Sequence, residues 1–485
     1  MAEKVLTSFT VVEKMQDTGI EVIIVGAGIG GLWAALECWR NGHKVRILDK
    51  TKGPETNGDF FTLNPAACKA FKHWPQMKAE HEKAACRPSF SCFQCDGTSL
   101  LSHERITSQT TDEMGVTVEA ELDTWRHLRP KLQQVLLRQL QRIGLSIEYG
   151  SCVTGYEETL DKGFVILDDG SRLEAGVVIA ADGIGTKSGQ MVLGHTLRAR
   201  SSGSAVYRCA YPVEVLDTDL ILSEHFRLYD GEGGASEMWI GPKLHLITTR
   251  NTETFSWAMT HRDNGMSSES WHSTSTPCQP ADAIKAIENA WGNCPDILKR
   301  MIEITPADTL LDFKIMWRDP NPTWTSPLGR VVQLGDAAHT FVPSSGNGAN
   351  QAIEDAVSLA CCLKIAGQQD IPTAVRVHNL LRFERVSCAQ ITGFQNQANR
   401  ENAHWDLLAS HPESVKPKLG RWIWEHDAED YANDNYANAC QKLLCSAAFG
   451  NTNIPPGYKY RPWNIDQLLE MMESGDPIVF DGDWN

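Results

Sequence analysis

The chain has 485 residues, 42% of them hydrophobic and 22% charged, with a formal net charge of −16. This length exceeds what one hydrophobic core usually serves and predicts two or three globular domains. The acidic balance argues against a nucleic-acid-binding protein, because phosphate binding needs clustered Lys and Arg. No apolar run reaches the roughly 18 residues of a membrane span. Residues 1–19 lack the apolar segment of a secretory signal, which favours a cytoplasmic location.

The first recognisable unit begins at residue 20. Residues 20–25 form a short run rich in Ile and Val, which is typical of a buried parallel strand. A glycine-rich turn follows at 26–31, then a predicted helix over 32–41 and a second strand over 44–48. A strand, a glycine-rich turn, a helix and a strand within about 30 residues indicate a Rossmann-type βαβ unit.

The glycine-rich turn fits the dinucleotide-binding pattern GxGxxG at Gly26, Gly28 and Gly31. In this pattern the first glycine permits the tight turn, the second lets a pyrophosphate approach the backbone, and the third lets the helix pack on the strand. The pyrophosphate lies at the helix N-terminus, where free N–H groups favour an anion. Asp49 ends the second strand, just before Lys50, and has the spacing to accept hydrogen bonds from a ribose diol. The βαβ unit alone does not show whether the dinucleotide is NAD or FAD.

Further along, strands and helices alternate before the chain becomes helical. The predicted strands cover residues 146–149, 163–167, 177–181, 205–211, 244–249 and 331–334. The predicted helices cover residues 128–143, 281–290, 295–302 and 350–363, with a loop at 264–280 and mainly helix beyond 372. Short β-rich segments between residues 202 and 262 indicate an antiparallel sheet in a second domain.

The 14 cysteines are scattered through the chain. Cys92 and Cys95 have CxxC spacing, but no second CxxC and no histidine pair at zinc spacing accompany them. We therefore expect reduced thiols and no metal site.

Two further motifs select FAD. Asp182-Gly183 follows the strand at 177–181, and Gly335-Asp336 follows the strand at 331–334 and leads into a glycine-rich segment that ends at Asp355. With the first turn, they stand in the order found in class A, single-component FAD-dependent monooxygenases of the salicylate and p-hydroxybenzoate hydroxylase type. The chain resembles these enzymes over residues 20–397 and is similar to fungal members that tailor secondary metabolites.

The resemblance implies a role for each motif. Asp336 would bind the ribityl chain, and Gly346 and Gly348 would place a helix N-terminus against the N1–O2 edge of the flavin, where negative charge develops on reduction. Asp182 would lie near the flavin and the route of the nicotinamide cofactor, although Gly189 stands where the family has an Arg. The implied cofactor-binding residues are Gly26, Gly28, Gly31, Asp49, Lys50, Arg129, Asp182, Asp336, Pro343, Gly346, Gly348 and Asn350.

An arginine at the start of the helix at 128–143 completes this set. Relatives have an Arg, two residues and a Leu there, and Arg129 fits, with Pro130 well placed in a first helical turn. Arg126 is the alternative, and plain surface charge is the other interpretation of either residue.

The resemblance also implies the reaction. NAD(P)H would reduce FAD, and O₂ would add to give a C4a-hydroperoxyflavin that transfers one oxygen atom to a small electron-rich molecule of aromatic, phenolic, polyketide or indole type, by hydroxylation or epoxidation. Arg208 is the predicted catalytic residue, since a fixed cation lowers the pKa of a phenol; a structural ion pair is the alternative. Some relatives use a Tyr where this chain has Thr249. Trp239 and Phe341 could each form an aromatic wall of the substrate pocket, and packing in the hydrophobic core is the alternative for both.

The predicted fold is α/β: a Rossmann-type FAD-binding domain, a β-sheet substrate domain and a helical C-terminal region. We assign residues 20–82, 123–195 and 310–370 to the first, 83–122 and 196–309 to the second, and 371–485 to the third. Two alternatives on the same fold are a flavin-dependent halogenase and a non-oxygenating flavin reductase or oxidase. The WxWxIP motif of halogenases is missing, and its nearest match is Trp422-Ile423-Trp424. A non-enzymatic scaffold that retains FAD is a further alternative.

Overall fold

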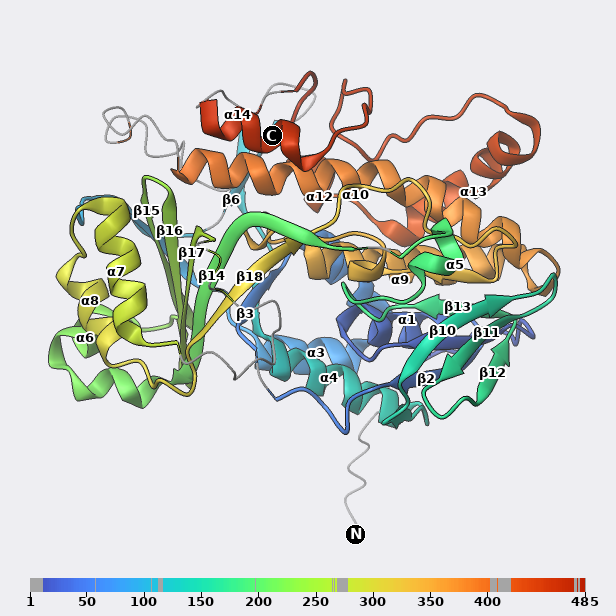
Figure 1. The fold of residues 1–485 in the computed structure, drawn as a ribbon, viewed down its shortest axis with the longest axis horizontal. Coiled ribbons are helices and arrows are strands. Elements are labelled where there is room, and N and C mark those ends of the chain that lie inside the picture. Colours follow the sequence, from blue (N-terminus) through green and yellow to red (C-terminus); the bar gives the residue numbers. More distant parts are fainter. Residues whose placement is uncertain are drawn as a thin grey trace, which may run out of the picture.

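The computed structural model shows two large β-sheets side by side (Figure 1). It describes residues 12–56, 58–105, 107–111, 117–196, 198–263, 265, 267, 278–401, 408, 420–474, 478 and 480–484. One sheet is parallel, in the order β19-β13-β1-β2-β9. Its strands are β1 (Glu21–Val25), β2 (Lys44–Asp49), β9 (Ile147–Tyr149), β13 (Val177–Ala180) and β19 (Val331–Gln333).

Both faces of the parallel sheet are covered, which explains why its central strands are apolar without alternation. On one face lie α1 (Ile29–Arg40), α4 (Arg129–Arg142) and α9 (Gly348–Ala366), which share a core with every second strand residue. On the other face lies an antiparallel sheet of β10 (Val153–Glu158), β11 (Gly163–Leu167) and β12 (Arg172–Ala175).

The second large sheet has seven strands in the order β18-β14-β17-β16-β15-β4-β5. They are β4 (Ser89–Gln94), β5 (Ser99–Glu104), β14 (Arg200–Pro212), β15 (Gly234–Gly241), β16 (Leu244–Asn251), β17 (Thr254–Arg262) and β18 (Leu311–Trp317). The outer face packs on α6 (Leu220–His225), α7 (Pro280–Trp291) and α8 (Asp296–Glu303). Because side chains alternate along a strand, the neighbours of these outer residues face the parallel-sheet half.

Smaller elements join the two halves. An antiparallel pair of β3 (Phe60–Leu63) and β8 (Trp125–Leu128) leads into α2 (Pro65–Cys68), the 3₁₀ helix η1 (Lys69–His73) and α3 (Pro75–Ala84) on one side, and into α4 on the other. The remaining short elements are β6 (Thr107–Thr111), β7 (Thr117–Glu121), α5 (Gly189–Leu193), η2 (Val213–Thr218), η3 (Gly335–Ala337), η4 (Pro343–Ser345) and η5 (Gln368–Asp370).

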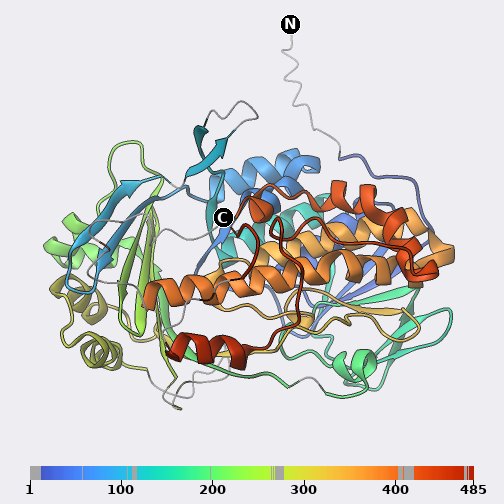
Figure 2. The ribbon, with the colours of Figure 1, turned by 90° about the horizontal axis from the view of Figure 1, so that it is seen from above.

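The C-terminal part is built on one long helix, α10 (Ile371–Glu401), which runs across both halves (Figures 1 and 2). Helices α12 (Arg421–Trp424), α13 (Ala428–Cys445) and α14 (Ile465–Ser474) pack along it, and aromatic residues of the tail close a core with β14 and β18. Within the part of the chain that the structure describes, no helix is both long and apolar enough to cross a membrane.

These elements confirm the predicted fold class, with strand and helix boundaries shifted by a few residues. One boundary differs. Residues 311–317, predicted with the cofactor domain, form β18 and pair with β14 in the seven-stranded sheet. The division into domains otherwise stays a prediction, and most of the predicted loop at 264–280 falls outside the described residues.

Candidate functional site

The glycine-rich turn has the geometry that a dinucleotide requires. Gly26 has a φ of +105°, and a Cβ there would lie 2.3 Å from the carbonyl oxygen of Ala181. A Cβ on Gly31 would lie 1.9 Å from the carbonyl oxygen of Gly26. Both positions therefore exclude any side chain. A Cβ on Gly28, by contrast, would meet no protein atom within 4 Å.

Gly28 is the N-cap of α1, and no side chain caps this helix end. The first N–H groups of α1 are thus left without a side-chain cap beside open space at Gly28, and a helix N-terminus of this kind can bind a pyrophosphate. Asp49 lies beside this turn: its Oδ2 accepts a hydrogen bond from the Ala27 N–H at 2.6 Å, and its Oδ1 accepts one from the Thr51 N–H at 2.8 Å. Lys50 is exposed. The roles of Asp49 and Lys50 toward a ribose stay predictions.

The turn after β19 is fixed on its buried side by an arginine, and the carboxylate of Asp336 on this turn is exposed. The guanidinium of Arg318 is buried and donates to the backbone carbonyls of Asp336 and Ala337. This fixes the turn and leaves the Asp336 side chain exposed, which is what a residue that binds a ligand hydroxyl requires. Sequence reasoning missed Arg318, since it lies about twenty residues before the motif.

The following segment ends in an open helix N-terminus. Gly346 has a φ of +60° with open space where a Cβ would be, and α9 begins at Gly348 without a side-chain cap. Pro343 is exposed at the start of η4. Asn350 is buried and structural: its Nδ2 donates to the carbonyls of Thr62 and Gly346 at 3.0 and 2.7 Å. Asn350 thereby fixes the Gly346 turn against β3.

Asp182 shapes a third loop of the site. Its Oδ2 accepts hydrogen bonds from the Tyr156 hydroxyl at 2.7 Å and from the Lys187 N–H at 3.3 Å. Its Oδ1 is buried and has no partner among the described residues. Such an atom is costly to leave unpaired, and it marks a place for an external donor. Gly189, where relatives have an Arg, is buried at the start of α5.

Asp59 contacts both the predicted catalytic residue, Arg208, and one predicted cofactor-binding residue, Arg129. The Asp59 carboxylate pairs with the Arg208 guanidinium at 2.5 Å, and its backbone carbonyl accepts a hydrogen bond from the Arg129 N–H at 3.0 Å. Burial lowers the pKa of Arg129, Asp336 and Asp59 raise it, and Arg208 lowers it further. Asp336 and Arg208 therefore both lie within electrostatic reach of Arg129.

Arg208 lies on β14 and is only 4% exposed. The ion pair that sequence reasoning kept as an alternative is thus present, and it joins the seven-stranded sheet to the segment before β3. Asp59 was missed because it belongs to no motif. Trp239 and Phe341 were ambiguous: Trp239 lies in the core of the outer sheet face, stacked on Phe93, and Phe341 packs half-buried on the C-terminal core.

Behind the site lies a buried ionic cluster from α9 and α10. Asp355 pairs with His339 at 2.7 Å and with Arg382 at 2.9 Å, and it also accepts a hydrogen bond from the Gly335 N–H. Although burial raises its pKa, His339 and Arg382 hold the pKa of Asp355 well below its usual range. Beside it, Arg385 and Arg382 overcome burial and hold the pKa of Glu354 at about 2. These carboxylates are charged in the folded protein, and Asp355 fixes the turn that carries Asp336.

Arg382→Met is expected to destabilise the protein strongly. It would leave the buried charges of Glu354 and Asp355 poorly compensated, which costs about 3–5 kcal/mol. Denaturant unfolding should show this loss, while Arg376→Met, an exposed position on the same helix, should change the free energy of unfolding by less than about 0.5 kcal/mol. Equal stability of the two variants would contradict this role of the cluster.

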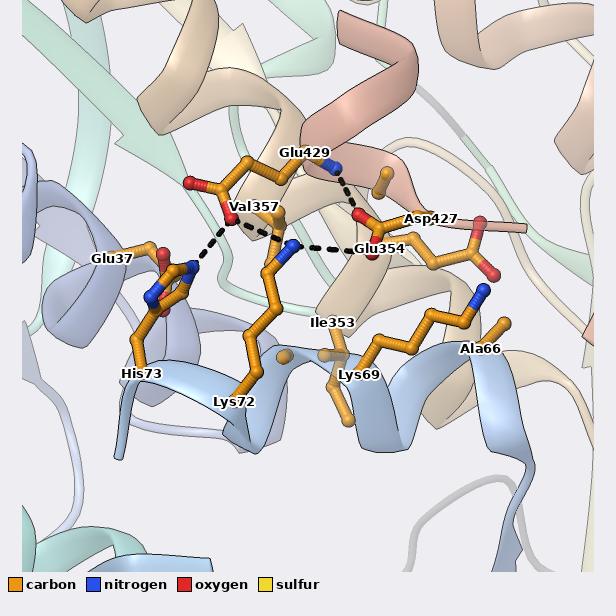
Figure 3. Close-up of a pocket in the computed structure, with 12 residues that line it drawn as sticks. Glu37, Ala66, Lys69, Lys72, His73, Ile353, Glu354, Val357, Asp427 and Glu429 are labelled. Carbon is orange, nitrogen blue, oxygen red and sulfur yellow. Dashed lines mark hydrogen bonds and ion pairs between the residues drawn. The ribbon is translucent and has the colours of Figure 1, made fainter. Parts of the chain in front are cut away.

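A separate hollow lies between η1, α9 and the start of α13 (Figure 3). Around it, Lys72 pairs with Asp427 and Glu429 at 3.1 and 3.2 Å, and His73 pairs with Glu429 at 2.6 Å. Its volume of about 10 Å³ suits a single water molecule. This hollow is a polar junction between helices, and it is too small for an organic substrate.

The halogenase-like Trp422-Ile423-Trp424 segment belongs to the C-terminal region. It forms α12, and the buried Arg385 guanidinium binds the carbonyls of Trp422 and Ile423. Its role in the structure is to anchor the C-terminal region.

Comparisons with known proteins agree with this geometry. Residues 19–369 match the family described as FAD binding domain. "FAD-dependent monooxygenase fsr3" of Gibberella fujikuroi is 36% identical over 475 residues, covering 96% of this chain and 90% of the relative. "FAD-dependent monooxygenase dmxR9" of a Cryptosporiopsis species is 35% identical over 480 residues, covering 98% of this chain and 91% of the relative.

Solved structures give the same result. A crystal structure of CtdE in complex with FAD and its substrate 4 aligns with a TM-score of 0.77 at 30% identity, covering 87% of this chain and 99% of CtdE. A salicylate hydroxylase substrate complex aligns with a TM-score of 0.65 at 19% identity, covering 85% and 97%, and so shares the fold. These findings confirm the resemblance to class A monooxygenases. The open N-terminus of α1, the exposed Asp336 and the unpaired Asp182 oxygen fit FAD, and the chain belongs to the FAD-binding-domain family and is an FAD-dependent monooxygenase.

Proposed function

We propose that this monooxygenase takes electrons from NADH or NADPH and inserts one oxygen atom of O₂ into a small electron-rich organic molecule, of aromatic, phenolic, polyketide or indole type, in secondary metabolism. The observation that carries the proposal is that Asp59 joins Arg208 to Arg129, and that Asp336 lies within electrostatic reach of Arg129. Arg129, the proposed cofactor-binding cation, and Arg208, the proposed substrate-facing cation, thus lie together where the two halves of the protein meet. A cytoplasmic location remains a prediction.

In this proposal each part of the chain has a physical task. The α1 N-terminus binds the pyrophosphate and Asp336 the ribityl chain, while the α9 N-terminus stabilises negative charge on the reduced ring. FAD, when bound and reduced, supplies the activation of O₂. Arg208, fixed by Asp59, lowers the pKa of a substrate hydroxyl placed beside it. The side chains around Arg208 on β14 and β18, among them Phe313 at 5.0 Å from its guanidinium, exclude water.

The donor is tested with the FAD-loaded protein under anaerobic conditions. We expect NADH or NADPH to bleach the yellow flavin absorbance, and to do so faster in the presence of a phenol from a substrate panel. The control is NAD⁺, the oxidised form, which has no hydride to donate and should leave the flavin absorbance unchanged. Failure of both NADH and NADPH to reduce the flavin with every phenol present would overturn the proposed donor.

A further inference from the structure

Arg126 is a second cation that faces the seven-stranded sheet from the other half of the protein. It lies on β8, opposite Thr62 of β3. Its Nη1 donates to the Thr62 hydroxyl at 3.1 Å and its Nη2 to the Thr249 hydroxyl at 2.6 Å. The side chain is largely buried, and its Nε has no partner among the described residues.

The partners of Arg126 are neutral. Across the described parts of the chain, no carboxylate lies within ion-pairing distance of it, and Asp59 acts on it only from further away. Asp59 also raises the pKa of Arg129 and forms an ion pair with Arg208. A largely buried cation held only by hydroxyl groups is costly, because no nearby charge offsets its lost hydration. Burial lowers the pKa of Arg126 to about 10, so the guanidinium stays charged at neutral pH.

Thr249 places this cation on the same sheet face as Arg208. The register pairs Arg208 with Ala258 of β17 and Ala258 with Ile247 of β16, and Thr249 follows Ile247 by two residues. Residues two apart on a strand share a face, so both arginines meet the face that looks toward the parallel-sheet half. Three arginines therefore lie around this junction, and the carboxylates of Asp59, Asp336 and Glu55 act on Arg129, but Asp59 alone of these acts on Arg126, and only from a distance.

We propose that Arg126 is a substrate-binding residue that receives an acidic oxygen of the substrate, a carboxylate or an ionised phenol, while Thr62 and Thr249 fix its guanidinium. An anion beside Nε would supply the missing partner and offset the buried charge. This inference rests on the proposed function, whose substrate class it narrows from electron-rich molecules to acidic ones.

The test compares two probes of nearly the same shape, benzoate and the neutral benzamide. Each is titrated into the FAD-loaded protein, and binding is followed by the change in the visible absorbance of the flavin. We expect benzoate to bind about 10-fold more tightly than benzamide, as one partly screened charge pair provides. Arg126→Gln, which keeps a donor but loses the charge, should reduce this preference to within about twofold, while Arg126→Lys should retain most of it.

Two further variants separate binding from a structural role. Thr249→Asp leaves Arg126 in place but gives it an internal carboxylate, so the preference for benzoate should disappear without loss of thermal stability. Arg250→Gln is the matched control: Arg250 is the next residue on β16, but it binds the Phe226 carbonyl on the outer face, so the preference should persist.

The inference is overturned if benzoate and benzamide bind equally to the unaltered protein. It is also overturned if both Arg126→Gln and Thr249→Asp keep the full preference. Reduction by NADPH is measured on the same samples. A protein that is reduced normally but shows no preference for the acid refutes only the role of Arg126, whereas a protein that NADH and NADPH both fail to reduce refutes the proposed donor.

Discussion

Gly28→Ala will give a folded protein that has lost most of its affinity for FAD. The added methyl group meets no protein atom within 4 Å, so folding of the apoprotein should be unaffected. It would, however, occupy the space through which a pyrophosphate reaches the α1 N-terminus. Losing about 3 kcal/mol of charge-assisted hydrogen bonding corresponds to about 100-fold weaker binding. Titration of the apoprotein with FAD, followed by flavin fluorescence, measures this loss.

Two other glycines control the experiment. Gly450→Ala adds a methyl group to another open and exposed position, after α13, and it should bind FAD normally. Gly31→Ala would press a methyl group on the Gly26 carbonyl and should reduce both stability and FAD binding. If Gly28→Ala bound FAD as tightly as Gly450→Ala, the pyrophosphate would not lie at this turn.

Removing Arg208 will abolish most product formation while FAD stays bound. Arg208→Met alone would leave the Asp59 carboxylate without its partner, which could cost about 3–5 kcal/mol of stability. The informative variant is therefore the double one, Arg208→Met with Asp59→Asn. We expect product formation to fall by about 100-fold or more, as when a preorganised electrostatic group is lost from an active site. FAD affinity should change by only a few-fold.

Arg200→Met is the matched control for this experiment. Arg200 lies on the same strand, β14, but it is exposed and pairs with Asp319 and Asp466. Its loss should leave product formation unchanged. If the Arg208 double variant made product at the rate of the Arg200 variant, the ion pair with Asp59 would be only structural.

The sequence predicted the parts of this molecule that depend on local patterns. Continuous apolar runs identified β1, β13 and β19 because a parallel strand is buried on both faces. The spacing of Gly26, Gly28 and Gly31 identified the turn, because only glycine tolerates the contacts that the structure shows at two of these positions.

The sequence could not predict how distant segments meet. Asp59 and Arg318 lie in no motif, yet one carries the counter-charge of Arg208 and the other fixes the Asp336 turn. Arg382 lies in the region that was predicted only as mainly helical, and the packing of α10 on α9 brings it to Asp355. The pairing of β18 with β14 was also not predicted, because strand pairing is a non-local interaction that the sequence of one segment does not specify.

The central claim is that this protein transfers an oxygen atom from O₂ to an organic molecule, and isotopic labelling tests it most directly. The FAD-loaded protein is incubated with NADPH, ¹⁸O₂ and the phenol that most accelerates flavin reduction, and the product is analysed by mass spectrometry. The account predicts one ¹⁸O atom per molecule of product, with none incorporated from labelled water. A product formed without ¹⁸O, with all the label in hydrogen peroxide or water, would contradict it.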